Sequence, residues 1–126
     1  MRANVSASRP VPDARAAIGA LTAELKTHGI VVYGPHADGS PATFELRAML
    51  LSTENIEDPV TGSANAALAA LLTQQRNRPG DAYTVRQGTA LDRDGRVKIV
   101  YDDASDKPAI WIGGHSVTMI DGTFLL

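Results

Sequence analysis

Residues 62–75 read GSANAALAALLTQQ, and the expected fold follows from this stretch. Alanine and leucine favour helix, and they recur here with almost no polar face between them. A helix that is apolar on all sides is normally buried on all sides. In a domain this small, strands must then surround the helix. We therefore expect a central Ala-rich helix with a sheet wrapped around it.

Short runs rich in β-branched and aromatic residues lie on both sides of this helix, and they predict strands. These runs are residues 30–33, 43–50, 83–87, 96–101, 109–112 and 116–120. The dipeptide Asp94-Gly95 predicts a two-residue hairpin turn between the strands beside it. The resulting element order has no regular alternation of strand and helix, which favours an α+β fold with a curved mixed sheet or a barrel.

A second helix is predicted from Pro12 to His28, because apolar residues form one stripe at helical spacing. The stripe consists of Ala14, Ala17, Ile18, Leu21 and Leu25. An amphipathic helix of this kind lies on the outside of a domain. Residues 1–11 hold few large apolar side chains, so we expect a linker-like lead-in there and a single domain over residues 12–126.

Composition and net charge exclude several classes of partner and of chemistry. The chain has 126 residues, a formal net charge of −2 and no cysteine. This charge gives no electrostatic reason to expect nucleic acid or an anionic membrane as a partner. The absence of cysteine excludes disulfides, thiolate metal sites and thiol acid–base chemistry. The histidines show no ligand spacing, so no metal site is expected. No cofactor is expected either. Without a secretory or membrane-spanning pattern, the expected location is cytoplasmic.

Residues 57–64 read EDPVTGSA and are the sharpest candidate for a site. The first N–H groups of a helix have no intrahelical partner and carry partial positive charge, so this helix start can hold a carboxylate or a phosphate. Asp58 would lie beside the bound anion and could exchange a proton or orient another group. The structural alternative is that Thr61 or Ser63 caps the helix and Asp58 favours its dipole. The pattern alone leaves both interpretations open.

The longer run EDPVTGSANAALAALL, residues 57–72, resembles the signature of the PhzF-like family. This family contains the phenazine-biosynthesis-type isomerases of the diaminopimelate epimerase-like fold. Companion motifs follow in the family's order, namely Arg47 upstream and, downstream, Gln87-Gly88, residues 93–97, residues 112–114 and Val117-Thr118. The resemblance runs from about residue 4 to the end of the chain. It covers the second, C-terminal half of the family's proteins only.

This resemblance implies a barrel-like sheet around a central helix, with the active site in a cleft between two similar halves. It implies that Asp58 is catalytic, and that Thr61, Gly62 and Ser63 bind the carboxylate of a small substrate. Family members without the cysteine pair use a glutamate of the first half for proton transfer at carbon. The motifs of that first half are not among these 126 residues.

Three functional hypotheses remain open. The chain is one half of an isomerase that works with a separate first-half chain; or two copies form a homodimer that binds a small carboxylate with weak or no catalysis; or the chain is an inactive, truncated gene product. A lone half should expose apolar surface that normally faces its partner, and such surface marks interfaces. We therefore expect self-association, as a homodimer, unless a first-half chain takes that place.

Overall fold

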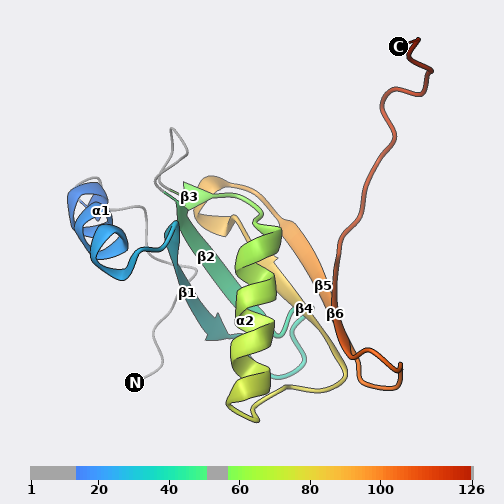
Figure 1. The fold of residues 1–126 in the computed structure, drawn as a ribbon, viewed down its shortest axis with the longest axis horizontal. Helices are drawn as coiled ribbons and strands as arrows, with labels where there is room; N and C mark the ends of the chain where they lie inside the picture. The colour runs from blue at the N-terminus through green and yellow to red at the C-terminus, as the bar shows by residue number, and fades with distance from the viewer. Residues whose placement is uncertain (1–13, 51–56, 126) are drawn as a thin grey trace.

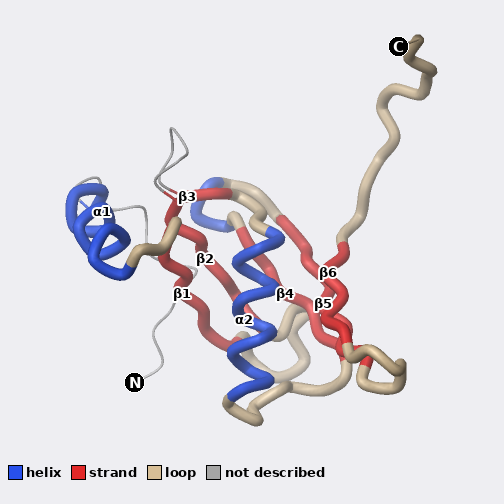
Figure 2. The backbone as a smooth tube through the Cα atoms, in the orientation of Figure 1, coloured by secondary structure: helices blue, strands red, loops and turns tan. Residues whose placement is uncertain are grey.

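The computed structural model describes residues 14–50 and 57–125, and within them it contains two α-helices and one six-stranded sheet (Figures 1 and 2). The predicted lead-in at residues 1–11 lies outside this part. The α+β class is confirmed. In chain order the elements are α1 (Ala14–Leu25), β1 (Gly29–Pro35), β2 (Phe44–Leu50), β3 (Glu57–Asp58), α2 (Gly62–Gln74), β4 (Ala82–Gln87), a 3-10 turn (Thr89–Leu91), β5 (Gly95–Asp102) and β6 (Ala109–Gly113).

The sheet is mixed and open. Its strands lie in the order β1-β2-β4-β5-β6, and the short β3 pairs with β2 beyond the end of β4. All pairs are antiparallel except β2 with β4. A parallel pair requires a crossover connection, and α2 provides it by lying across one face of the sheet (Figure 1). The curved mixed sheet is thus found, and the barrel is not.

The core lies between α2 and the sheet. Leu68, Ala69 and Leu72 of α2 are buried against the sheet. Along β4 and β5, buried residues alternate with less buried ones. On β5 this alternation buries Val97, Ile99 and Tyr101. The Tyr101 hydroxyl donates a hydrogen bond of 3.1 Å to the carbonyl of Ala69, which satisfies a polar atom inside the core.

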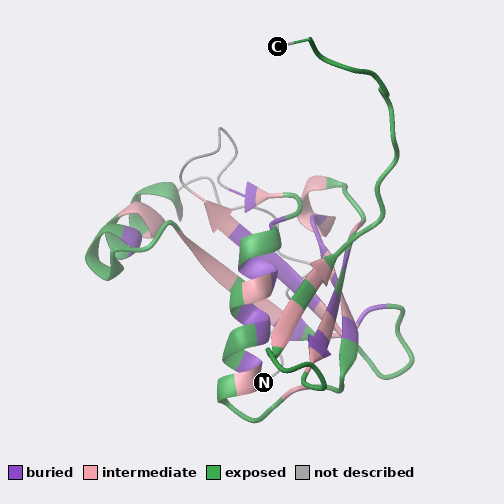
Figure 3. Cartoon of the chain, turned by 45° about the vertical axis from the view of Figure 1, so that its right-hand side comes forward, coloured by how far each residue is buried: buried purple, intermediate pink, exposed green. Residues whose placement is uncertain are grey.

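Burial of α2 is one-sided, which corrects the expectation that it is covered all round. Ala67, Ala70 and Leu71 are exposed, and Figure 3 shows the buried residues of α2 on the side that faces the sheet. The strands stop at β1 on one side and β6 on the other. No described segment therefore covers the outer face of this apolar helix.

The second helix, α1, lies beside β1 and outside the sheet, as predicted (Figure 1). The predicted apolar stripe is mostly uncovered, because Leu21 and Leu25 are exposed and Ile18 is only partly buried. Thr22 of α1 is buried, but it lies outside the stripe. In the part of the chain that is described, neither helix is long and apolar enough to span a membrane.

The predicted strand at residues 116–120 is wrong. Residues 114–125 form neither helix nor strand and run away from the body of the molecule (Figures 1 and 2). A strand needs a neighbour for its backbone hydrogen bonds. This segment continues past the end of β6, where the described residues offer no neighbouring strand.

The two-residue turn at Asp94-Gly95 is also wrong, because residues 88–94 connect β4 to β5 and Gly95 is already the first residue of β5. Glycine is needed there for close packing. A Cβ atom on Gly95 would lie 2.4 Å from Cγ2 of Val60 and 2.8 Å from the carbonyl oxygen of Gln87. Gly95 therefore lets the loop before α2 rest on the start of β5.

Candidate functional site

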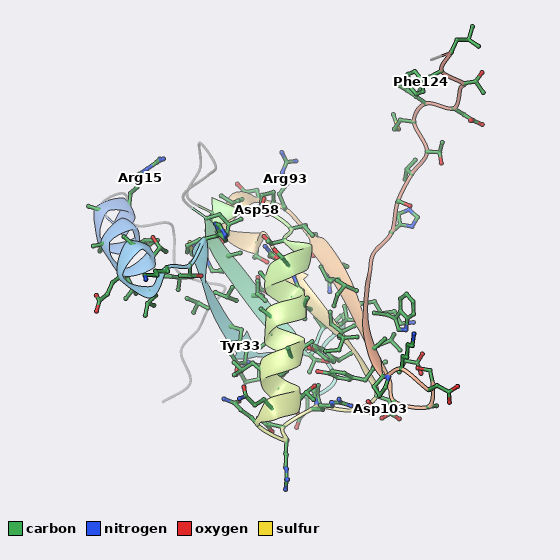
Figure 4. The ribbon with its side chains drawn as sticks, in the orientation of Figure 1. Arg15, Tyr33, Asp58, Arg93, Asp103 and Phe124 are labelled. Carbon is green, nitrogen blue, oxygen red and sulfur yellow. The ribbon has the colours of Figure 1, made fainter. Side chains whose placement is uncertain are left out.

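The candidate site lies where β3 leads into α2. Asp58 is the last residue of β3, Thr61 is the N-cap residue, and α2 begins at Gly62. In the sheet, Asp58 lies opposite Ala48 of β2. Figure 4 shows Asp58 beside the N-terminal end of α2. The strand pairing therefore holds the predicted catalytic carboxylate at the helix start.

A buried ion pair holds β3 on β2. Arg47 of β2 donates from Nε to Oε1 of Glu57 over 2.9 Å and from Nη2 to Oε2 over 2.6 Å. The two side chains are 6% and 1% exposed. Bidentate pairs of this kind are geometrically specific, and a buried charge that loses its partner is strongly destabilising. Glu57 is thus a structural residue that fixes the position of Asp58.

Gln87 ties the turn between β3 and α2 together from β4. Its Nε2 donates to the carbonyl oxygen of Asp58 over 2.9 Å and to Oγ1 of Thr61 over 3.0 Å. Its Oε1 accepts from the Thr61 amide over 3.1 Å and from Nδ2 of Asn65 over 3.0 Å. Gln87 belongs to one of the companion motifs of the family resemblance, but the sequence analysis assigned no role to it. A signal was available, because strand alternation places Gln87 on the buried face with Tyr83 and Val85.

Thr61 does not cap the helix with its side chain, contrary to one of the two interpretations of the sequence. Its hydroxyl instead donates to Oδ2 of Asp58. Both the amide and the hydroxyl of Thr61 are therefore engaged inside the turn. The first intrahelical bond runs from the amide of Asn65 to the carbonyl of Thr61. The amides of Gly62 and Ser63 precede that bond, in the positions that lack an intrahelical acceptor.

A cleft of about 510 Å³ opens beside this helix start, within the size range of small-molecule sites. Val60 and Gly62 line it, together with residues 94–97 around the start of β5 and residues 112–115 around the end of β6. No described atom lies within 4 Å of the position that a Cβ on Gly62 would take. The helix start therefore faces open space at this point.

The structure brings the predicted site residues together only in part. Gly62 lines the cleft, whereas Asp58, Thr61 and Ser63 lie next to it in the chain and are not among its described lining residues. Ser63 is exposed, and Asp58 is partly buried. The predicted residues thus form one continuous helix start, of which Gly62 contacts the cleft directly.

The charged groups of the cleft were not predicted as site residues. Asp94 accepts hydrogen bonds from Arg96 and Arg86, and these bonds lower the pKa of the exposed Asp94 carboxyl below its usual value. His115 lies on the cleft wall and outside any strand. Across residues 14–50 and 57–125, no group of three or more His, Cys, Asp or Glu side chains could hold a metal ion.

Comparison with known proteins agrees with these motifs. Residues 4–122 match the family model described as phenazine biosynthesis-like protein. Over 96 residues the chain is 31% identical to "Antisense-enhancing sequence 1" of Schizosaccharomyces pombe, covering 75% of this chain and 31% of that protein. Over 99 residues it is 30% identical to "Uncharacterized isomerase mll1393" of Mesorhizobium japonicum, covering 75% of this chain and 32% of that protein.

A third relative is "Uncharacterized isomerase YddE" of Escherichia coli K12, 35% identical over 69 residues that make up 51% of this chain and 23% of that protein. The chain thus spans about a third or less of the length of these curated relatives. The family match, in contrast, covers nearly all of this chain. On that evidence the chain belongs to the phenazine biosynthesis-like, or PhzF-like, protein family.

Proposed function

We propose that this chain is the C-terminal half of an isomerase that transfers a proton at a carbon atom of a small carboxylate substrate. In this proposal a first-half chain or a second copy completes the site. Membership of the family supports the reaction type, and so do the two relatives whose names include "isomerase". The chain carries only part of the length of those relatives, so the completing half is a necessary part of the proposal.

The observation that carries the proposal is the arrangement at Thr61. Because its hydroxyl is turned to Asp58 and its amide to Gln87, no threonine side chain occupies the start of α2. The amides of Gly62 and Ser63 are then left for a substrate carboxylate, which is the kind of anion that a helix start stabilises. The open cleft beside Gly62 gives such a substrate room to enter.

Each residue then has a distinct role. Gly62 and Ser63 bind the substrate carboxylate through their backbone amides. Thr61 orients Asp58 through the hydrogen bond between their side chains. Asp58 assists proton transfer at the substrate carbon, because a carboxylate can both accept and return a proton. The principal base is a glutamate supplied by the first-half chain, as the family resemblance implies.

The second candidate is a domain that binds a small carboxylate, or is inactive, and forms a homodimer without catalysis. It is favoured by the extent of the match, since the chain corresponds to only about a third of the length of its relatives. Deuterium uptake from solvent into a small carboxylate that carries a hydrogen on its α-carbon, measured by mass spectrometry on the chain together with a completing half, separates the two. Uptake at a rate above the buffer blank supports isomerase-type proton transfer, and binding without uptake supports the second candidate.

The test of binding uses Gly62→Ala with benzoate as the probe and isothermal titration calorimetry as the assay. The added methyl group meets no described atom within 4 Å, so the fold should be unchanged. The methyl group would, however, occupy part of the open space at the helix start that the carboxylate is proposed to enter. We expect affinity to fall about tenfold, which corresponds to about 1.4 kcal/mol.

Gly122→Ala is the matched control, because its Cβ also meets no described atom within 4 Å and it lies away from the cleft. It should leave benzoate affinity unchanged. Equal affinity for both variants would mean that the helix start does not bind the carboxylate.

A further inference from the structure

Residues 114–125, here called the C-terminal arm, leave the end of β6 as extended chain and make no helix or strand (Figures 1 and 3). The large apolar side chains of the arm are between 66% and 103% exposed. They are Val117, Met119, Ile120, Phe124 and Leu125. Water contact with so many apolar side chains is unfavourable, and dense exposed apolar surface marks an interface.

The arm has the sequence pattern of a strand. Val117 and Met119 would share one face of an extended chain, and Ser116, Thr118 and Ile120 would share the other. It contains no proline, so every residue has a backbone N–H that can donate to a neighbouring strand. The arm therefore has the properties of a strand that lacks only a neighbour.

A matching surface exists on the other side of the molecule. Among the described strands, β1 pairs only with β2, so no described strand lies on its second edge. Between β1 and the uncovered face of α2 lies an apolar cavity of about 130 Å³, here called the α2 groove. Its lining residues are Val31 and Tyr33 of β1 and Ala67, Leu68 and Leu71 of α2.

We propose that the C-terminal arm of one copy adds as a strand to β1 of a second copy, with Val117 and Met119 over the α2 groove. Strand addition to an open edge gives affinity through main-chain hydrogen bonds and specificity through alternate side chains. The exchange is reciprocal, since one chain carries both the arm and its receiving surface, and a two-fold axis satisfies both at once. The resulting dimer is independent of the function proposed above.

A second copy fits the arm better than the arm's own chain does. The arm begins at β6, and β6 and β1 lie at opposite ends of the sheet order. In Figure 1 the arm points away from its own body, so its apolar side chains meet none of that body's core. In a two-fold dimer, each arm keeps this direction and reaches the edge strand of the other copy.

The first experiment measures the solution mass by size-exclusion chromatography with light scattering. The full chain should elute as a dimer of twice 13.3 kDa. The double variant Val117→Asp/Met119→Asp should weaken dimerisation by about a hundredfold, because two apolar side chains would no longer be buried. Thr118→Asp adds a charge to the opposite face of the same arm. Because that face does not lie over the α2 groove, the dimerisation constant should change less than about threefold.

These variants lie on exposed residues, so circular dichroism should show an unchanged fold. A wild-type chain that is monomeric at tens of micromolar would overturn the proposal. A dimer that the double variant leaves intact would overturn it equally.

The second experiment locates the contact by cross-linking. Because the chain has no cysteine, disulfides can form only between the added cysteines. Met119→Cys and Leu71→Cys variants, mixed and oxidised, should give a heterodimer with an interchain disulfide, whereas Thr118→Cys with Leu71→Cys should give far less. If a chain carrying both Met119→Cys and Leu71→Cys forms only an intrachain disulfide, the arm folds onto its own groove and the exchange is refuted.

Discussion

Replacing Gln87 with leucine should lower the free energy of unfolding, because this one amide holds the turn that forms the candidate site. Leucine is similar in size but makes none of the four hydrogen bonds of Gln87. The Thr61 amide would be left buried and unpaired, and the carbonyl of Asp58 would be left partly buried. Asn65 would keep its bond to the Thr61 carbonyl. One fully buried and one partly buried orphan group together cost about 2–4 kcal/mol.

Urea unfolding followed by far-ultraviolet circular dichroism measures this change, with the midpoint and slope fitted together. Arg86→Leu is the control, since it changes the adjacent β4 residue on the opposite face. Its partner Asp94 is mostly exposed, so the control should cost less than about 1 kcal/mol. If Gln87→Leu costs no more than Arg86→Leu, Gln87 does not hold the turn, and the reasoning fails.

Three further predictions concern neighbouring features. Arg47→Met should destabilise the fold by about 3–5 kcal/mol in urea unfolding, because Glu57 is left charged and buried; replacing both partners with apolar residues should recover most of that loss. Gly95→Ala should cost about 1–3 kcal/mol through overpacking, whereas Gly62→Ala should be nearly neutral in the same assay, and equal effects would contradict the contacts described. Since its neighbouring arginines lower the pKa of Asp94 from 3.8, its stabilising effect should be present above pH 3.8 and lost as the pH falls through the lowered pKa; the stability difference from Asp94→Asn, measured against pH, should therefore disappear in acid.

The sequence predicted most of the elements because their signals are local. The Ala-rich run became α2, and alternation along residues 96–101 became β5. The errors occurred where the outcome depends on what lies beside a segment. Residues 116–120 alternate as a strand does, but no neighbouring strand lies beside them among the described residues. The outer face of α2 is apolar, but no described strand reaches it.

At the candidate site, too, local features were predicted from the sequence and contacts between distant residues were not. The helix-start motif located Asp58 and Gly62 correctly at the junction of β3 and α2. The role of Gln87 was missed because its partners lie more than twenty residues away in the chain. The two interpretations of Thr61 could not be separated from sequence, since the same hydroxyl can cap the helix or bond to Asp58. Only the side-chain geometry distinguishes them.

The most direct measurement of the central claim is the backbone amide spectrum of the chain during titration with benzoate. If the start of α2 binds a carboxylate, the proton resonances of Gly62 and Ser63 should move downfield as their amides form charge-assisted hydrogen bonds. Benzamide, which has the same ring without the negative charge, should leave them in place. Equal shifts with both compounds, or none with benzoate, would contradict the claim that this helix start is a carboxylate site.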